Sequence, residues 1–296
     1  MKKKIKTFVP IITPFDKKNN IDYFSLEKFI IYISNIEEIK NIILFSNCSE
    51  YNFISNNEKI DIINCINNTL HNNINIYLKI SNLYHKNDIL NIINQNIYKN
   101  IYYFIIDYPY LNKSYNKEII NNYNKIFKEK KYLNFYFTIN NNLNIDEKIF
   151  LKIKEKNKNF IGVINKSNFF FKNYNLIKNI KIIIYNDINF FNNLIINING
   201  IISPLFNILF KYIYINIIKK INNNKIIVYD YKFFKFLKLI NILYKKMYFI
   251  SGLKYLLNIN NICNFYVKLP CNNINNNKYY KKLKKIYKYI ILKNEN

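Results

Sequence analysis

Cysteine and histidine are the first residues to test for chemistry in this sequence, because they ligate metals and serve as nucleophiles and bases. The four cysteines are Cys48, Cys65, Cys263 and Cys271. They show neither CxxC spacing nor the spacing of a small disulfide framework. The two histidines, His71 and His85, are isolated. No Gly-rich turn follows the first apolar run, as a dinucleotide site would require. We therefore expect free thiols in a reducing cytoplasm, no metal site and no cofactor.

Lysine is the other abundant reactive residue, and it dominates the charge. The 296-residue chain carries a formal net charge of +27 and contains no arginine. Such charge suggests a polyanionic partner. However, the lysines are scattered, and the residue best suited to bidentate phosphate and base contacts is missing. We expect no specific nucleic-acid partner. Electrostatic binding of RNA by the lysines is an alternative, and the affinity would then fall steeply as the salt concentration rises.

No membrane segment is expected either. Asn and Lys interrupt the apolar runs well short of the ~20 residues that a span needs. The N-terminal sequence MKKKIK lacks the uninterrupted apolar region and small-residue cleavage site of a signal peptide. These features predict a cytoplasmic protein without a membrane partner.

Short apolar runs alternate with segments of helical periodicity, and this alternation defines the elements that must position any site. The runs cover residues 8–13, 42–45, 74–80, 102–106, 133–138, 160–163, 182–185 and 200–203. In the first helical segment, Leu26, Phe29 and Ile33 share one face, with Ser25 available as a cap. Parallel strands need such crossovers, so eight units predict a (β/α)8 TIM barrel over residues 1–225. An open doubly wound sheet is the alternative.

The pattern becomes purely helical in the last part of the chain. Two apolar stripes occur at helical spacing: Phe233, Phe236, Leu237 and Ile240, then Leu283, Ile286, Tyr287 and Ile290. Stripes of this kind form core or interface. We therefore expect a C-terminal helical region, residues 226–296, packed on the barrel.

Several motifs recur in an order that resembles one known family. They are VPIITPFD at 9–16, SNCSE at 46–50, PYLNK at 109–113, FIGV at 160–163, GIIS at 200–203 with Asn207, and KLP at 268–270. Together they resemble the dihydrodipicolinate synthase and N-acetylneuraminate lyase family of Schiff-base aldolases, closest to its 4-hydroxy-tetrahydrodipicolinate synthase branch. SNCSE stands where the family has Gly-Thr-Thr-Gly-Glu after its second strand.

The resemblance implies that a lysine at the end of the sixth strand condenses with pyruvate, giving an enamine that attacks an aldehyde. In the synthase branch, which serves diaminopimelate and lysine biosynthesis, the aldehyde is aspartate semialdehyde. An ungapped alignment puts Ile164 at the lysine position. Lys166 lies two residues further on, on the same side if the strand continues, and is the candidate nucleophile.

The proton relay of the family depends on a tyrosine and a threonine hydroxyl. The tyrosine aligns with Phe137, and its neighbour Tyr136 would serve only if the register shifts by one residue. A core role is the alternative for both aromatic residues. The threonine corresponds to Asn47 or Cys48. Asn donates and accepts hydrogen bonds but is a poor proton shuttle.

The remaining expectations concern substrate binding and assembly. Backbone N–H groups around Cys48 and Ser49 would hold the pyruvate carboxylate. Tyr110 lies beside the position of the family's interface tyrosine, Asn142 aligns with its aldehyde-binding arginine, and Ile202 lies on the eighth strand. The resemblance implies a homodimer or homotetramer. Another pyruvate-dependent aldolase, such as a sialic-acid lyase, and a barrel retained without catalysis are the alternatives.

Overall fold

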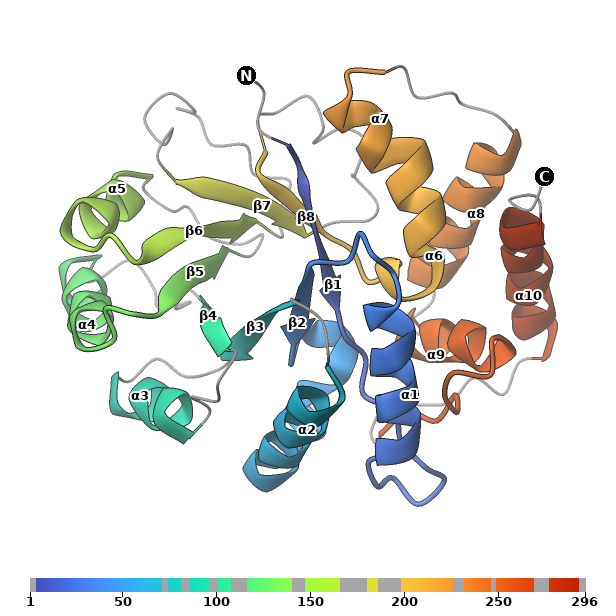
Figure 1. Ribbon diagram of the computed structural model, residues 1–296, viewed down its shortest axis with the longest axis horizontal. Helices are drawn as coiled ribbons and strands as arrows, with labels where there is room; N and C mark the ends of the chain where they lie inside the picture. The colour runs from blue at the N-terminus through green and yellow to red at the C-terminus, as the bar shows by residue number, and fades with distance from the viewer. Residues whose placement is uncertain are drawn as a thin grey trace.

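The fold is a closed barrel of parallel strands with helices around it (Figure 1). The computed structural model describes residues 4–70, 74–80, 86–95, 101–107, 116–139, 147–165, 180–185, 198–225, 231–245, 249–268 and 277–292. The strands pair in chain order, and the first pairs with the eighth to close the ring. This architecture confirms the predicted (β/α)8 barrel and excludes the open doubly wound sheet.

Each of the eight strands overlaps one of the predicted apolar runs. They are β1 (Lys6–Pro10), β2 (Asn41–Leu44), β3 (Asn75–Ile80), β4 (Ile101–Asp107), β5 (Asn134–Ile139), β6 (Phe160–Asn165), β7 (Lys181–Tyr185) and β8 (Gly200–Ile202). One face of each strand lines the barrel interior and the other packs under the helices. Because both faces are buried, the strands are continuous apolar runs rather than alternating ones.

Helices and short turns connect the strands. The helices of the barrel are α1 (Tyr23–Ser34), α2 (Asn56–Thr69), α3 (Lys86–Gln95), α4 (Asn116–Glu129), α5 (Glu147–Lys156), α6 (Phe206–Ile213), the π-helical η4 (Tyr214–Ile218) and α7 (Lys219–Asn222). Two 3-10 turns, η1 (Asn47–Ser49) and η2 (Tyr51–Phe53), follow β2. Within the described ranges, none of the helices combines the length and hydropathy needed to cross a membrane.

The start of α1 differs from the prediction in one detail. Leu26, Phe29 and Ile33 are buried as expected. However, the N-cap is Asp22, whose carboxylate accepts the backbone N–H of Ser25 at 3.0 Å and the Ser25 hydroxyl at 2.7 Å. The predicted cap at Ser25 is therefore wrong. A carboxylate three residues earlier satisfies one free N–H group of the first turn and suits the positive end of the helix dipole.

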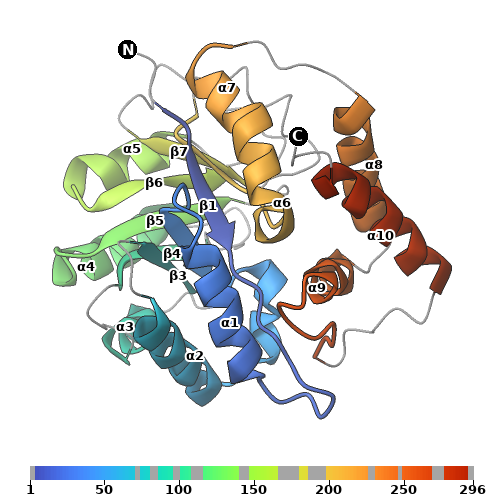
Figure 2. The same cartoon turned by 45° about the vertical axis from the view of Figure 1, so that its right-hand side comes forward.

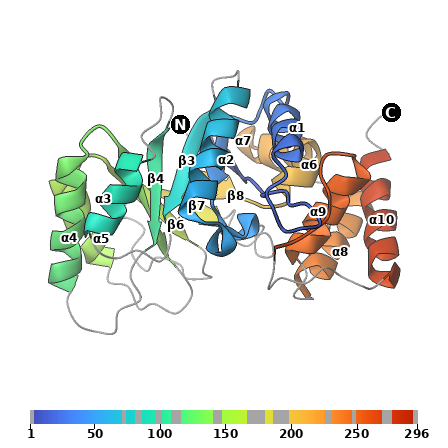
Figure 3. The same cartoon turned by 90° about the horizontal axis from the view of Figure 1, so that it is seen from below.

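Three further helices, α8 (Tyr231–Lys245), α9 (Phe249–Ile259) and α10 (Asn277–Leu292), follow the barrel and gather on one side of it, beyond α1 and α6 (Figures 2 and 3). Helix α10 packs on α8 and α9, and α9 packs on α6. Most side chains of the two predicted stripes are buried, and Leu237 is partly exposed. The helical character expected after residue 226 is therefore present in α8, α9 and α10.

Replacing Gly162 with alanine is expected to destabilise the barrel. A Cβ atom at position 162 would lie 2.1 Å from the backbone oxygen of Lys181 on β7, and this backbone cannot move without disturbing the β6–β7 pairing. We expect a loss of about 1–3 kcal/mol in the free energy of unfolding, measured by urea titration. Gly252→Ala in α9 is the matched control, because the atom nearest its new Cβ is a movable methyl of Leu243. Equal losses in the two variants would refute this explanation.

Candidate active site

The barrel interior is filled by one side chain from each strand. This interior layer consists of Phe8, Ile43, Tyr77, Ile105, Tyr136, Ile164, Ile183 and Ile202. All of these side chains are buried. The layer is a packed core, so a site for small molecules must lie beyond it, at the carboxyl ends of the strands, as in (β/α)8 enzymes generally. Ile202, a predicted substrate-binding residue, belongs to this layer. It can therefore contribute only an apolar surface below the site.

Strand β5 turns Tyr136 toward the interior and Phe137 away from it. Phe137 packs outside the barrel, with its ring centroid 4.6 Å from that of Tyr123 and 5.1 Å from that of Phe160. The Tyr136 and Tyr77 rings lie with their centroids 6.0 Å apart, and burial raises the pKa of both phenols above the ordinary value. Both therefore remain protonated at neutral pH. Of the two aromatic residues predicted for the relay, only Tyr136 faces the interior.

Two neighbouring residues of strand β6 show which of its faces lines the barrel interior. Ile164 lies in the interior layer, whereas Val163 belongs to the core between the barrel and the helices. Three of the predicted site residues, Lys166, Tyr110 and Asn142, lie outside the residues that the structure describes. The interior position that aligns with the family's lysine is therefore occupied by an isoleucine.

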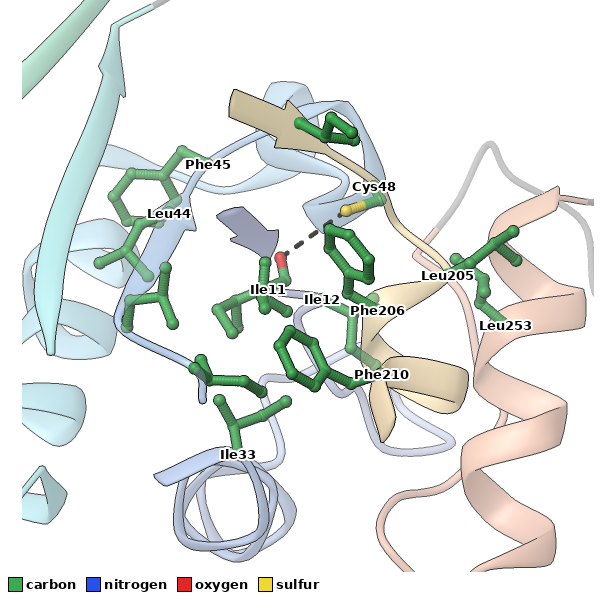
Figure 4. Packing of buried hydrophobic residues seen from close by; sticks show 14 of the residues in the cluster. Ile11, Ile12, Ile33, Leu44, Phe45, Cys48, Leu205, Phe206, Phe210 and Leu253 are labelled. Atoms are coloured by element: carbon green, nitrogen blue, oxygen red, sulfur yellow. Dashed lines mark hydrogen bonds between the residues drawn. The ribbon is translucent and has the colours of Figure 1, made fainter. Parts of the chain in front are cut away.

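The loop after β2 is held against β1 by its own side chains. Ser49 donates both its N–H and its hydroxyl to the Ser46 carbonyl, at 3.0 and 2.7 Å. The buried Cys48 thiol donates to the Pro10 carbonyl at 3.2 Å and lies 3.9 Å from the Ile11 carbonyl (Figure 4). Of the three loop residues predicted for the site, Asn47 alone is exposed. The Cys48 and Ser49 side chains therefore shape the loop, and the Ser49 backbone N–H is itself engaged by the Ser46 carbonyl.

Glu50 ties this loop to the C-terminal helices. Its backbone is left-handed, with φ 57°. Its carboxylate pairs with Lys254 of α9, and both side chains are completely buried. The second oxygen accepts the backbone N–H of Lys268 at 2.6 Å. Burial is the largest influence on the pKa of Glu50 and raises it, while Lys254 and the Lys268 N–H oppose the shift. Glu50 belongs to a motif noticed in the sequence, but Lys254 is one of many lysines and carried no signal of its own.

Two charged residues missed by the sequence analysis end neighbouring strands. Lys79 is the last residue of β3 that faces the barrel interior, and Asp107 is the last such residue of β4. They lie two residues beyond Tyr77 and Ile105, which belong to the interior layer. The Lys79 ammonium lies 3.3 Å from Asp107 Oδ1, with side chains only 5% and 8% exposed. It also donates to Asn47 Oδ1 at 3.3 Å. The sequence did contain a signal for these two residues. Each is a lone charge at the end of a buried apolar run, and burying a charge is costly unless it is paired.

The described residues supply amine, carboxylate and hydroxyl groups at the mouth of the barrel. In this part of the chain, no three His, Cys, Asp or Glu side chains come together as a metal site would require. Cys48, Cys65 and Cys263 are free thiols, and burial raises the pKa of Cys263 to about 12. Cys271 lies outside the described residues. The arrangement therefore suits the donation and acceptance of protons at the mouth of the barrel.

A family comparison agrees with this architecture. The sequence profile of the Dihydrodipicolinate synthetase family matches residues 3–290. The 4-hydroxy-tetrahydrodipicolinate synthase of Karelsulcia muelleri (strain GWSS) is 28% identical over 278 residues, which cover 88% of this chain and 90% of that relative. The likeness therefore extends over barrel and C-terminal helices alike.

Solved structures share the fold at low sequence identity. The 4-hydroxy-tetrahydrodipicolinate synthase of Methylacidiphilum fumariolicum SolV superposes with a TM-score of 0.77 at 17% identity, covering 99% of both chains. The N-acetylneuraminate lyase of Fusobacterium nucleatum superposes with a TM-score of 0.75 at 17% identity, covering 98% of this chain and 99% of that one. Likeness at these identities shows the fold and does not discriminate between the two reactions.

Proposed function

Since the chain belongs to the dihydrodipicolinate synthetase family, we propose that it is a 4-hydroxy-tetrahydrodipicolinate synthase that condenses pyruvate with aspartate semialdehyde through a Schiff base on Lys166. The reaction serves diaminopimelate and lysine biosynthesis and takes no cofactor. The choice of reaction is supported by the synthase of K. muelleri, matched over most of both chains.

One observation carries the assignment of the nucleophile: Ile164 faces the barrel interior. Side chains alternate along extended backbone, so continuation of β6 by two residues would put position 166 on the same face, at the carboxyl end of the barrel. The apolar layer that includes Ile164 and Tyr136 would lie directly below. Partial desolvation of a lysine favours the neutral amine that attacks a keto group.

The other predicted residues have supporting roles in the proposal. Tyr136 supplies the phenol that Phe137 lacks, and Asn47 contributes an amide at the mouth of the barrel. Backbone N–H groups of the loop around Cys48 and Ser49 bind the pyruvate carboxylate, which would share the Ser49 N–H with the Ser46 carbonyl. Tyr110 and Asn142 bind substrate, and Asn142 offers the aldehyde a neutral amide in place of a guanidinium. The loss of a bidentate charged contact should weaken aldehyde binding.

The proposal is tested by trapping the Schiff base. We expect purified protein incubated with pyruvate and borohydride to carry one reduced adduct, which peptide mass spectrometry locates at Lys166. Turnover with aspartate semialdehyde then separates the synthase from a sialic-acid lyase, which would instead cleave N-acetylneuraminate. Folded protein without an adduct would sink the enzyme proposal.

A barrel without catalytic activity is the second candidate function, favoured by the isoleucine at the aligned lysine position. It predicts that no lysine reacts with pyruvate, although the protein is folded and binds a partner. Assembly as a homodimer or homotetramer and a cytoplasmic location complete the main proposal. Sedimentation velocity of the purified protein tests the assembly state.

A further inference from the structure

Two buried oxygen atoms at the carboxyl ends of β4 and β5 lack hydrogen-bond partners. They are Thr138 Oγ1 and Asp107 Oδ1, which form no hydrogen bond with any residue in the part of the chain that the structure describes, although the Lys79 ammonium lies 3.3 Å from Asp107 Oδ1 as an ion pair. Asp107 is 6% exposed and Thr138 is 1% exposed. Asp107 has the Lys79 charge beside it, whereas a buried hydroxyl without a partner, such as that of Thr138, costs free energy and needs an explanation.

Both atoms lie at the interior mouth of the barrel. Asp107 and Thr138 are paired in register across β4 and β5, and Thr138 is paired with Ile164 on β6. Each lies two residues beyond a member of the interior layer, so both side chains share its face. Lys79 extends the row onto β3 through its ion pair with Asp107. The result is a polar row across β3, β4 and β5, directly above an apolar floor.

We infer that Asp107 and Thr138 form the proton-transfer site of the reaction, with Lys79 as the residue that positions Asp107. The inference rests on the proposed function, because it assigns to these groups the protons that Schiff-base formation on Lys166 must move. It also explains how the chain dispenses with the relay hydroxyls that Phe137 and Asn47 lack. Lys79 itself is not the nucleophile, because its ammonium is engaged by Asp107 and Asn47.

The proton transfers of Schiff-base formation can be assigned to Lys166, Asp107 and Thr138. The Asp107 carboxylate takes a proton from the Lys166 ammonium, and the neutral amine then bonds to the keto carbon of pyruvate. The proton that the attacking nitrogen releases reaches the keto oxygen through the Thr138 hydroxyl, giving a carbinolamine. Protonated Asp107 then returns its proton to the carbinolamine hydroxyl, which leaves as water as the nitrogen forms the iminium. Asp107 ends as a carboxylate and Thr138 as a neutral hydroxyl.

The test compares near-isosteric variants in the pyruvate-trapping reaction. We expect Thr138→Val and Asp107→Asn to slow adduct formation by about 100-fold or more, the usual contribution of general acid–base groups. Thr138→Ser, which keeps the hydroxyl, should restore much of the lost rate. Thr7→Val is the matched control, because Thr7 is also buried in a strand but neighbours an interior residue and so faces outward. Asp107→Asn should also change the pH profile of trapping, which a structural role would not do.

Each outcome bears on a different claim. Slow trapping in both variants supports the inference, provided that circular dichroism shows both to be folded and that the melting midpoint of Thr138→Val matches that of Thr7→Val; Asp107→Asn should melt lower, because it leaves the Lys79 ammonium buried without its counter-charge. Trapping at the wild-type rate in both variants overturns it and leaves the proposed function intact. An adduct on Lys79 overturns it as well, because Lys79 would then be the nucleophile. A wild-type protein that forms no adduct overturns the proposed function and this inference together.

Discussion

Replacing Lys166 with methionine is expected to abolish the pyruvate adduct and to lower turnover by on the order of 10⁴-fold or more. Removal of a covalent nucleophile has effects of this size, because no other group can form the intermediate. Methionine matches the length and flexibility of lysine but offers no amine. Trapping with borohydride, followed by peptide mass spectrometry, measures the adduct, and a coupled assay with aspartate semialdehyde measures turnover.

Lys158→Met is the matched control for this variant. Lys158 is exposed and precedes β6 at its amino end, so both variants remove one lysine next to the same strand. The control should trap pyruvate and turn over like the wild type. Persistence of an adduct in Lys166→Met would contradict the assignment, and its location would identify the lysine that does react. The result also tests whether position 166 shares the interior face of β6 with Ile164, because a side chain must lie on that face to reach the mouth of the barrel.

Replacing Glu50 with glutamine is expected to lower the free energy of unfolding by about 3–5 kcal/mol. The change leaves the Lys254 ammonium buried without its counter-charge, and both side chains are completely inaccessible in the folded protein. Lys254 keeps a hydrogen bond to the Tyr266 carbonyl at 2.9 Å, which cannot replace a carboxylate. Urea titration followed by circular dichroism gives the difference in free energy.

A second ion pair in the same region provides the control. Lys268 contacts Glu58 at 2.8 Å, but these side chains are 17% and 31% exposed. Lys268→Met should therefore cost about 1 kcal/mol or less, because solvent screens the pair. Glu50→Leu combined with Lys254→Met should recover much of the stability lost in Glu50→Gln, since apolar pairs often replace buried ion pairs without loss. A cost below about 1 kcal/mol for Glu50→Gln would refute the account.

The pair also links stability to the candidate site. Glu50 directly follows the η1 turn that holds Cys48 and Ser49, and its left-handed backbone is costly for a residue with a side chain. The contacts to Lys254 and to the Lys268 N–H hold this conformation. The C-terminal helices therefore help to keep the loop after β2 in place, although the proposed chemistry belongs to the barrel.

Local patterns were enough to predict the order of elements. Each apolar run between helical segments became a strand of the barrel, and the helical faces with Phe29 or Leu283 are buried. These predictions succeeded because strand and helix formation depend on residues close in sequence and on the burial of their apolar faces. Even the cap of α1 failed only by a few residues, since both Asp22 and Ser25 have suitable side chains.

Patterns in the sequence were sufficient to predict the (β/α)8 architecture and the helical C-terminal region, and its motifs were sufficient to recognise the family. The face of each strand that lines the barrel interior could be identified only in the folded chain. A strand buried on both faces, such as β5 with Tyr136 and Phe137, has no alternation from which its orientation can be read. The pairs Glu50–Lys254 and Lys79–Asp107 join different elements, the first across 204 residues. Such contacts exist only after the barrel closes and brings distant charges together, away from water.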